Sequence, residues 1–183
     1  MRDAGLEEKL ATELSASRGK GGVFLIRCKP EDYRRAAIAA ASVLTRKMGL
    51  SGAYVTLSRP FKKISEDLSE NGADTAKIFF IDGSGSGGRD SEKCKFLEGE
   101  SLTELSLAIS SALGSRNPDF YVIDSITTML IYNDDETVQK FVHYLSSKVQ
   151  NMGKLLVLIS VEEEKSNRLV PALTQFCDKV IHT

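Results

Sequence analysis

Six short apolar runs recur along this 183-residue chain, and none of them alternates with polar residues. Continuous apolar runs of this length are typical of strands whose two faces are both covered by helices. Segments with helical spacing separate most of the runs, as in parallel sheets with crossover helices. The sequence therefore predicts an α/β fold, with a mainly parallel central sheet between two layers of helices. The predicted strands are Val23–Cys28, Ala53–Leu57, Lys77–Ile81, Phe120–Asp124, Leu155–Ser160 and Lys179–His182.

Two of the helices can be placed from apolar spacing and from their caps. Between residues 136 and 150, apolar side chains recur as they do on one face of a helix. Asp134 or Asp135 can cap its first turn, and Gly153 can end it. A second helix is predicted over Ser101–Leu113, where the first serine begins a capping box.

The N-terminal part of the chain is also predicted to contain helices. The alanine-rich run 36–41 predicts a slim helix that can lie close to the sheet. Residues 1–20 are predicted to form an extension containing a helix over Leu6–Leu14, packed on a sheet edge or on a partner. We expect residues 1–183 to form one domain.

Charge and hydropathy restrict the expected partners and location. The net charge is −1, which gives no long-range attraction to nucleic acid. The sequence has no run of about 18 apolar residues, and its N-terminus is too polar for a signal peptide. We therefore expect a cytoplasmic protein that binds neither nucleic acid nor membranes.

The three cysteines are widely spaced and form no C-x-x-C pattern. This usage fits a reducing compartment and argues against a structural zinc, so no metal site is predicted. Cys28 and Cys177 are predicted to be small buried apolar groups. Cys94 is predicted to be a thiol in a loop.

The segment after the first predicted strand is poorly suited to bind a triphosphate. A phosphate-binding loop follows such a strand with G-x-x-x-x-G-K-[ST], whose backbone N–H groups surround the phosphates. Here Pro30 removes an N–H donor, and Glu31 and Asp32 would face the phosphates as like charges. At about 4 Å each repulsion is on the order of 4 kcal/mol, whereas micromolar binding supplies about 8 kcal/mol. ATP and Mg²⁺ are therefore not expected to bind, and no cofactor is predicted.

Two segments carry a resemblance to a known ATPase family. Val23–Ile26 match the strand before a phosphate-binding loop, and Gly52–Pro60 match the next strand with its closing motif. In this register the chain resembles the RecA superfamily, and most closely the KaiC-like ATPase domains common in archaeal signalling. The resemblance places Arg34 at the family's phosphate-binding lysine and Arg35 at its Mg²⁺-binding hydroxyl. A pair of glutamates, one of them the general base, is replaced by Ser58 and Arg59.

The segment Asp119–Ser125 is an apolar strand that ends in an acid, similar to a Walker B element. In that element the aspartate orders the Mg²⁺ of a bound nucleotide, which would be the ancestral role of Asp124. The alternative is that Asp124 only caps the next segment. The family's active strands flank one ligand, so we expect Val23–Cys28 and Phe120–Asp124 to be adjacent in the centre of the sheet.

The resemblance implies a three-layer RecA-like fold with a degenerate Walker A motif and no catalytic residue. What remains would be a vestigial nucleotide-binding site, whose expected members are Cys28, Lys29, Arg34, Arg35, Asp124, Ser125 and Ser160.

The basic residues of this segment allow two interpretations. Arg34 and Arg35, with Lys29 and Arg27, could bind an anion, or they could pair locally with Glu31 and Asp32. We favour local pairing. Asp32 is also predicted to cap the helix that enters the alanine run, since an aspartate before a helix accepts from N–H groups two or three residues on.

The glycine-rich residues 82–90 contain a formal G-x-G-x-x-G after a predicted strand. A dinucleotide site needs a helix that begins at these glycines, and a polar, aperiodic stretch follows instead. We predict a flexible surface loop over residues 82–95, while a role as a lid or a partner-binding loop stays open.

Other candidates for chemistry are weaker. His143 and His182 have no neighbouring serine or cysteine, so both are predicted to be solvated or packing residues. The charged run 162–168 is predicted to be a solvated loop. The resemblance leaves an interface role open for Ser160 and Arg168.

Three function classes are compatible with the sequence. We favour a catalytically inactive RecA/KaiC-like domain in regulation or signal transduction, which contacts a protein partner or a second copy. The second class is a sensor that binds a nucleotide or phosphate ligand without hydrolysis. An active ATPase with an atypical loop ranks last, because the glycines, lysine, hydroxyl and glutamate base are all absent.

Overall fold

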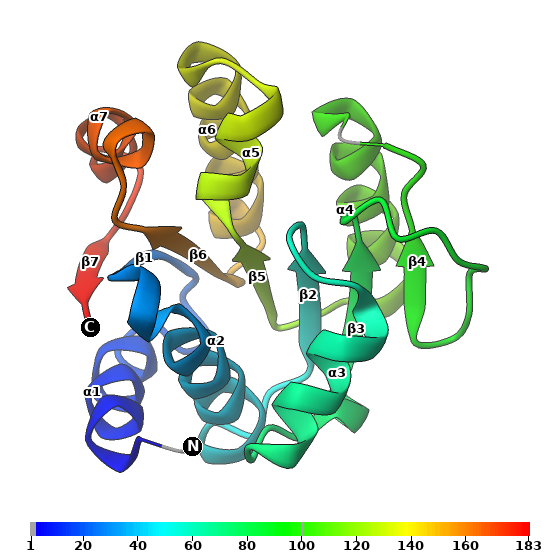
Figure 1. Ribbon diagram of the computed structural model, residues 1–183. Coiled ribbons are helices and arrows are strands. Elements are labelled where there is room, and N and C mark those ends of the chain that lie inside the picture. The colour runs from blue at the N-terminus through cyan, green and yellow to red at the C-terminus, as the bar shows by residue number, and fades with distance from the viewer. Residues whose placement is uncertain (1–2, 100) are drawn as a thin grey trace.

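The computed structural model describes residues 3–99 and 101–183, and its centre is one sheet of seven parallel strands. The order across the sheet is β4-β3-β2-β5-β6-β1-β7 (Figure 1). This confirms the predicted parallel α/β fold. The strands are β1 Gly22–Cys28, β2 Gly52–Thr56, β3 Ile78–Asp82, β4 Cys94–Phe96, β5 Phe120–Asp124, β6 Leu155–Val161 and β7 Lys179–His182.

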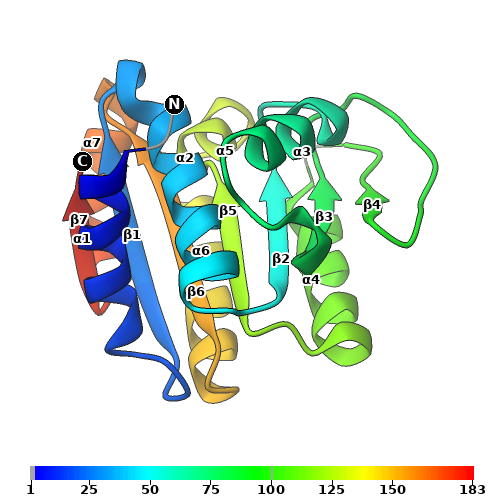
Figure 2. The same cartoon turned by 90° about the horizontal axis from the view of Figure 1, so that it is seen from below.

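Helices cover both faces of the sheet, so the molecule has three layers. Figures 1 and 2 show α1, α2 and α3 on one face and α4, α5, α6 and α7 on the other. Each side has its own apolar core, because alternate residues of every strand point to opposite faces. The helices are α1 Ala4–Ser15, α2 Tyr33–Ser42, α3 Phe61–Glu70, α4 Leu102–Arg116, α5 Ile126–Tyr132, α6 Asp135–Asn151 and α7 Glu164–Thr174. Within the described residues, none of these helices has the length and apolar character that a membrane span requires.

The helix caps follow the sequence closely. Ser101 accepts a hydrogen bond from the backbone N–H of Glu104 and begins α4. Asp134, one of the two predicted candidates, caps α6. The charged run 162–168 was predicted to be a loop, and this is wrong. Most of it forms the first turns of α7, which begins with a capping box between Glu163 and Ser166.

The alanine run makes α2 slim, as predicted. The side chains of residues 36–41 are all buried, and a methyl group lets the helix axis lie close to the sheet. Next to it, α1 buries Leu10 and Leu14 against the same core. Lys9 of α1 donates to the carbonyl of His182 at 2.7 Å. The N-terminal helix therefore packs on this chain's own α2 and β7 edge.

The predicted adjacency of the strands β1 and β5 is wrong, because β6 lies between them. β6 is the most apolar strand, and its residues 155–159 are at most 2% exposed. Such a strand is favoured in the interior of a sheet, where both faces and both edges are covered. The register still brings the carboxyl ends together, since Cys28 pairs with Val161 and Asp124 with Ile159 on either side of β6.

A seventh strand, β4, overlaps the end of the segment 82–95 that was predicted as a loop. It contains Cys94, which is buried, so the prediction of a loop thiol is wrong. The residues before the strand fold back on its outer edge. The N–H of Cys94 donates to Ser91 Oγ at 3.1 Å, and the N–H of Phe96 donates to Asp90 Oδ1 at 2.9 Å. Three residues in a polar context carry too little apolar pattern to predict a strand. The flexibility of the preceding glycines stays a prediction.

Candidate functional site

The candidate site lies at the carboxyl ends of β1, β6, β5 and β2, beside the first turn of α2. Asp124 is the last residue of β5 and its side chain is inaccessible to solvent. Tyr33, the first residue of α2, donates its hydroxyl to one carboxylate oxygen of Asp124. Tyr54, in the middle of β2, donates to the other. Both oxygens of the carboxylate are thus engaged by phenols of the same chain.

Burial dominates the electrostatics of this cluster. It raises the pKa of Asp124, while the hydrogen bonds from Tyr33 and Tyr54 and the charge of Arg59 act in the opposite direction. Burial and the nearby carboxylate raise the pKa of both tyrosines as well. The phenols therefore keep their protons and remain donors to Asp124.

Ser58 and Arg59, which the resemblance places at the family's two glutamates, both contact Tyr33. The Tyr33 hydroxyl lies 3.0 Å from Ser58 Oγ. The guanidinium carbon of Arg59 lies 5.6 Å from the centre of the Tyr33 ring, within the range of a cation–π contact. These contacts hold the Tyr33 side chain, whose hydroxyl donates to Asp124.

Arg34 and Arg35 point to different partners. Nε of Arg34 donates to both carboxylate oxygens of Asp67 on α3, at 3.0 and 2.9 Å. Arg35 pairs with Asp32 at 2.7 Å and with Asp3 at 3.3 Å. The prediction of local pairing is therefore confirmed for Arg35 and wrong for Arg34.

Asp32 does not cap α2, so that prediction is also wrong. The chain enters the helix through a 3-10 turn over Pro30–Asp32. Asp32 has φ −96° and ψ −8°, which is a helical conformation and not the extended one of a capping residue. Its carboxylate accepts from Arg35 instead.

The remaining predicted site residues have structural surroundings. Burial, followed by the charge of Asp124, raises the pKa of the Cys28 thiol to about 12, so it is not a nucleophile at neutral pH. Ser125 accepts from the backbone N–H of Thr128 and caps α5. The alternative that Asp124 caps this segment is therefore wrong. Ser160 is buried, and its hydroxyl has no hydrogen-bond partner among the described residues. Lys29 is exposed before the 3-10 turn.

The histidines and Cys177 add no chemistry to this site. His143 packs on the ring of Phe176, with the ring centres 4.7 Å apart, as a packing residue does. His182 is exposed at the end of β7. Cys177 is half-buried, so the prediction of a buried group is only partly right.

These residues do not fit a magnesium nucleotide. Both oxygens of Asp124 already accept from the phenols of Tyr33 and Tyr54, so a metal ion would have to compete with these hydrogen bonds for the carboxylate. The resemblance places Arg34 and Arg35 at the family's phosphate-binding lysine and Mg²⁺-binding hydroxyl. Here both guanidinium groups pair with carboxylates of the same chain. In residues 3–99 and 101–183, three or more His, Cys, Asp or Glu side chains nowhere gather into a site that could hold a metal ion.

The patterns considered in the sequence did not single out Tyr33, Tyr54 or Asp67. One signal was available for Asp67, which lies between Ile64 and Leu68 on the buried side of α3. A carboxylate on the apolar face of a helix needs a charged partner, and that partner had to come from another element.

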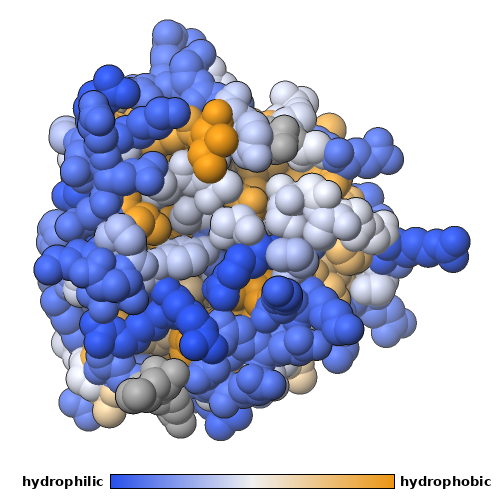
Figure 3. Space-filling view, in the orientation of Figure 1, coloured by the Kyte–Doolittle hydropathy of each residue, from blue (hydrophilic) through white to orange (hydrophobic). Residues whose placement is uncertain are grey.

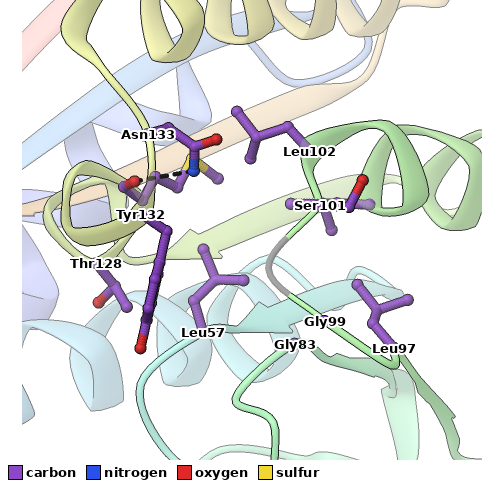
Figure 4. Close-up of a pocket in the computed structure, with 11 residues that line it drawn as sticks. Leu57, Gly83, Leu97, Gly99, Ser101, Leu102, Thr128, Tyr132 and Asn133 are labelled. Carbon is purple, nitrogen blue, oxygen red and sulfur yellow. Dashed lines mark hydrogen bonds between the residues drawn. The ribbon is translucent and has the colours of Figure 1, made fainter.

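A groove opens beside this cluster, between α4, α5 and the carboxyl ends of β2 and β3 (Figure 4). Its cavity volume is about 20 Å³, so the groove is shallow. Figure 4 shows Tyr132 and Leu57 on one side of it, and Leu97 and Leu102 on the other.

Replacing Asp67 with alanine is expected to lower the free energy of unfolding by about 1–2 kcal/mol. Asp67 pairs with Arg34 and Arg59 and is only 10% exposed, so its loss leaves the partly buried Arg59 without its paired carboxylate. Arg34→Ala should cost less, because the Arg34 side chain is 59% exposed. Urea denaturation of both variants would check this order, and an equal loss would contradict it.

Acid should weaken the same interaction. Hydrogen bonds from Arg34 lower the pKa of Asp67 below its ordinary value. The stabilisation is therefore complete above the ordinary aspartate pKa and is lost as the pH falls through the folded-state pKa. The difference in the free energy of unfolding between wild type and Asp67→Ala should therefore shrink as the pH falls through this range.

The comparisons with known proteins agree with this fold. A family model described as a family of unknown function (DUF7504) matches residues 21–183. Among curated proteins, none matches the sequence significantly. The crystal structure of the KaiC-like protein PH0186 from the hyperthermophilic archaeon Pyrococcus horikoshii OT3 is similar, with a TM-score of 0.67 and 16% identity. The match covers 90% of this chain and 71% of that one, and it shows the RecA/KaiC-like fold that the sequence predicts.

Proposed function

Since this chain belongs to DUF7504, a family of unknown function, we propose a function from the site itself. The protein is a catalytically inactive RecA/KaiC-like domain that acts in regulation or signal transduction. It works through contacts with another protein and hydrolyses no nucleotide.

The engagement of Asp124 is the observation that carries this proposal. In the resembling ATPases this position would serve the metal ion of the nucleotide. Here Tyr33 and Tyr54 take both carboxylate oxygens, and Ser58 and Arg59 hold Tyr33 in place. Opening the site would require breaking these hydrogen bonds and returning a buried acid to solvent.

The proposed contact with another protein is supported by the apolar side chains that one of the two helical layers exposes to solvent. All the large apolar side chains that are strongly exposed among the described residues lie on α4, α5 and α6 or at the end of α6. Exposed apolar residues gathered on one face mark interaction surfaces more often than scattered ones do.

We expect no nucleotide-dependent stabilisation and no phosphate release above background. With 1 mM ATP, ADP or GTP and Mg²⁺, a Kd above about 10 mM stabilises the fold by less than about 0.1 kcal/mol, which no melting curve resolves. Arg34→Lys should not restore turnover, since the glycines, the hydroxyl and the base are also missing. Thermal-shift and phosphate-release assays on the purified protein would check both points.

Two results would overturn the proposal in different ways. Metal-dependent phosphate release that disappears in Asp124→Asn would show an active ATPase. A clear thermal shift with ATP or a cyclic nucleotide, without hydrolysis, would favour a ligand sensor. Asp124→Asn is the suitable control because it keeps the size of the side chain and removes its charge.

A further inference from the structure

The N-terminal helix α1 lies outside the part of the chain that the family model matches. The match begins at residue 21, whereas α1 ends at Ser15. Between them, Gly19 has φ +74° and Gly21 has φ +80°, a left-handed backbone that side chains disfavour. α1 therefore precedes the matched domain and is joined to it by a link that contains glycines.

The surface beneath α1 has the form of a helix-binding site. Leu6, Leu10 and Leu14 lie four residues apart on one face of α1 and are buried in the core to which α2 contributes. α1 contacts α2 and the π-helical turn Val43–Lys47 that follows it. Figures 1 and 2 show α1 alongside α2. Apolar anchors one helical turn apart are also the means by which proteins bind the helix of a partner.

Opposite charges surround this apolar contact. Each of three acids from α1 and its N-cap pairs with a basic residue of the matched domain. The Glu7 side chain is only 3% exposed, and a buried carboxylate requires a cation beside it. The matched domain therefore presents an apolar strip and three basic groups to an acidic helix. The pairs are Asp3–Arg35 at 3.3 Å, Glu7–Lys47 at 3.8 Å, and Glu13–Lys179.

The outer face of α1 is polar, and the helix is short. Glu8, Lys9 and Thr12 are exposed, and Figure 3 shows hydrophilic side chains in the region of α1. Isolated helices of about twelve residues are marginal in water, and α1 has 12 residues. α1 therefore depends on the surface beneath it, and a competing helix on that surface would leave α1 unfolded.

We propose that α1 occupies a docking surface for an acidic amphipathic helix of a partner protein, and that the partner binds by displacing α1. The partner's helix places apolar residues on the strip formed by α2 and the turn after it. Its acids meet Arg35, Lys47 and Lys179. This inference rests on the proposed function, because it names the class of partner that the inactive domain contacts.

The composition of the surface favours this occupant over the others. Nucleic acid meets the basic groups but brings no apolar side chain to the strip. A basic helix sets like charges against the three basic residues, which opposes binding. An exchange of α1 between two copies of this chain fills each surface with an identical helix and so gains no contact.

Displacement is tested on the full chain by hydrogen exchange with mass spectrometry. The competitor is a peptide with the sequence of residues 3–17, in which serine replaces the exposed Thr12 so that its fragments differ in mass. A short link holds α1 at an effective concentration of about 1 mM, so about 5 mM peptide should displace it. The amides of α1 should then exchange at least tenfold faster, while those of β1 and β6 keep their protection. Unchanged exchange of α1 would overturn the proposal.

Two matched peptides show which features are recognised. One carries serine at the three leucine positions, and the other carries lysine in place of Asp3, Glu7 and Glu13. Neither should accelerate the exchange of α1 at the same concentration. If either peptide displaces α1 as well as the acidic one does, the surface does not select an acidic amphipathic helix and the proposal is wrong.

Variants of the full chain locate the binding, which is followed by the fluorescence anisotropy of labelled peptide. Leu10→Ser with Leu14→Ser loosens α1, so this variant should bind the acidic peptide at least tenfold more tightly than wild type. Glu8→Ser with Thr12→Ser changes the exposed face of α1 and should bind like wild type. Equal affinities of all three proteins would contradict the proposal. If the leucine variant does not fold, Glu7→Lys places a like charge near Lys47 and loosens α1 with its leucines intact.

The basic residues are tested in the variant with loosened α1. There, Lys47→Gln with Lys179→Gln should weaken binding of the acidic peptide about fivefold or more. Lys62→Gln with Lys63→Gln removes the same charge from exposed positions on α3, in the same layer, and should change the affinity less than about twofold. If the two pairs act alike, only net charge is sensed and the proposal falls.

Two further measurements keep the outcomes distinct. Sedimentation that shows a wild-type dimer, dissociated when α1 is loosened, would replace the partner with a second copy of this chain. Phosphate release on the same samples separates this inference from the proposed function. An inert protein whose α1 resists the peptide loses only this inference, whereas a hydrolysing protein that exchanges α1 for the peptide loses only the inactive assignment.

Discussion

Replacing Asp124 with alanine is expected to lower the free energy of unfolding by about 3 kcal/mol. The variant leaves the hydroxyl of Tyr54, which is fully buried, without an acceptor, and it also frees that of Tyr33. An unsatisfied buried polar group costs about 1–3 kcal/mol, and the missing carboxyl adds a small void. If Asp124 were an ordinary surface residue without these partners, its replacement would change the free energy of unfolding by no more than about 0.5 kcal/mol. Urea denaturation at neutral pH distinguishes the two results.

Asp124→Asn is the matched control, because the amide keeps an acceptor for one tyrosine and can donate to the other. It should remain within about 1 kcal/mol of wild type. The pH dependence carries a further test. Burial raises the pKa of Asp124, so folding favours its protonated form. That contribution is complete below the ordinary aspartate pKa of about 4 and is lost as the pH rises through the folded-state pKa. The stability of wild type relative to Asp124→Asn should therefore fall as the pH rises, and a constant difference would contradict the buried acid.

Gly52→Ala should cost about 3 kcal/mol, because an added Cβ would lie 2.5 Å from the ring of Phe120. The two residues face each other on β2 and β5, and Phe120 is fully buried. Ring and strand are held by the sheet, so neither can move away freely. Chemical denaturation of the variant gives the measurement.

Replacing a glycine with alanine at an exposed helical position should instead stabilise the protein. Gly114 lies exposed in α4, and a Cβ there meets nothing within 4 Å. Gly114→Ala is expected to stabilise the protein by about 0.5–1 kcal/mol, since alanine has the higher helix propensity.

Adding Phe120→Leu to Gly52→Ala should cost less than the sum of the single changes, because the smaller side chain relieves the contact. Strictly additive losses would mean that the ring is not the obstacle.

The sequence predicted the fold well because most of it is local. Apolar runs located six of the seven strands, and capping residues placed the starts of α4 and α6. The order of the strands was not predictable in this way. Placing β6 between β1 and β5 depends on long-range pairing, and an apolar run says that a strand is buried without naming its neighbours.

The site was harder to predict, because its central contacts join residues far apart in the chain. Tyr33 and Asp124 are separated by 91 positions, and Arg34 and Asp67 by 33. A carboxylate next to an arginine in the sequence was an obvious partner, and for Arg35 it was the right one. For Arg34, Asp67 competes successfully because it is held on α3, at a buried position where it needs a positive charge.

The loop that folds back on β4 also limits how the sheets of two molecules could pair edge to edge. Asp90 and Ser91 occupy the N–H groups that face away from β3, so another chain finds few free partners there. The strand at the opposite edge, β7, hydrogen-bonds only to β1 among the described strands, although Lys9 of α1 donates to the carbonyl of its last residue, His182. Filaments grow when every molecule offers two complementary edges, whereas one free edge is used up by a single neighbour. Edge-to-edge association through the sheet would therefore produce dimers and not filaments.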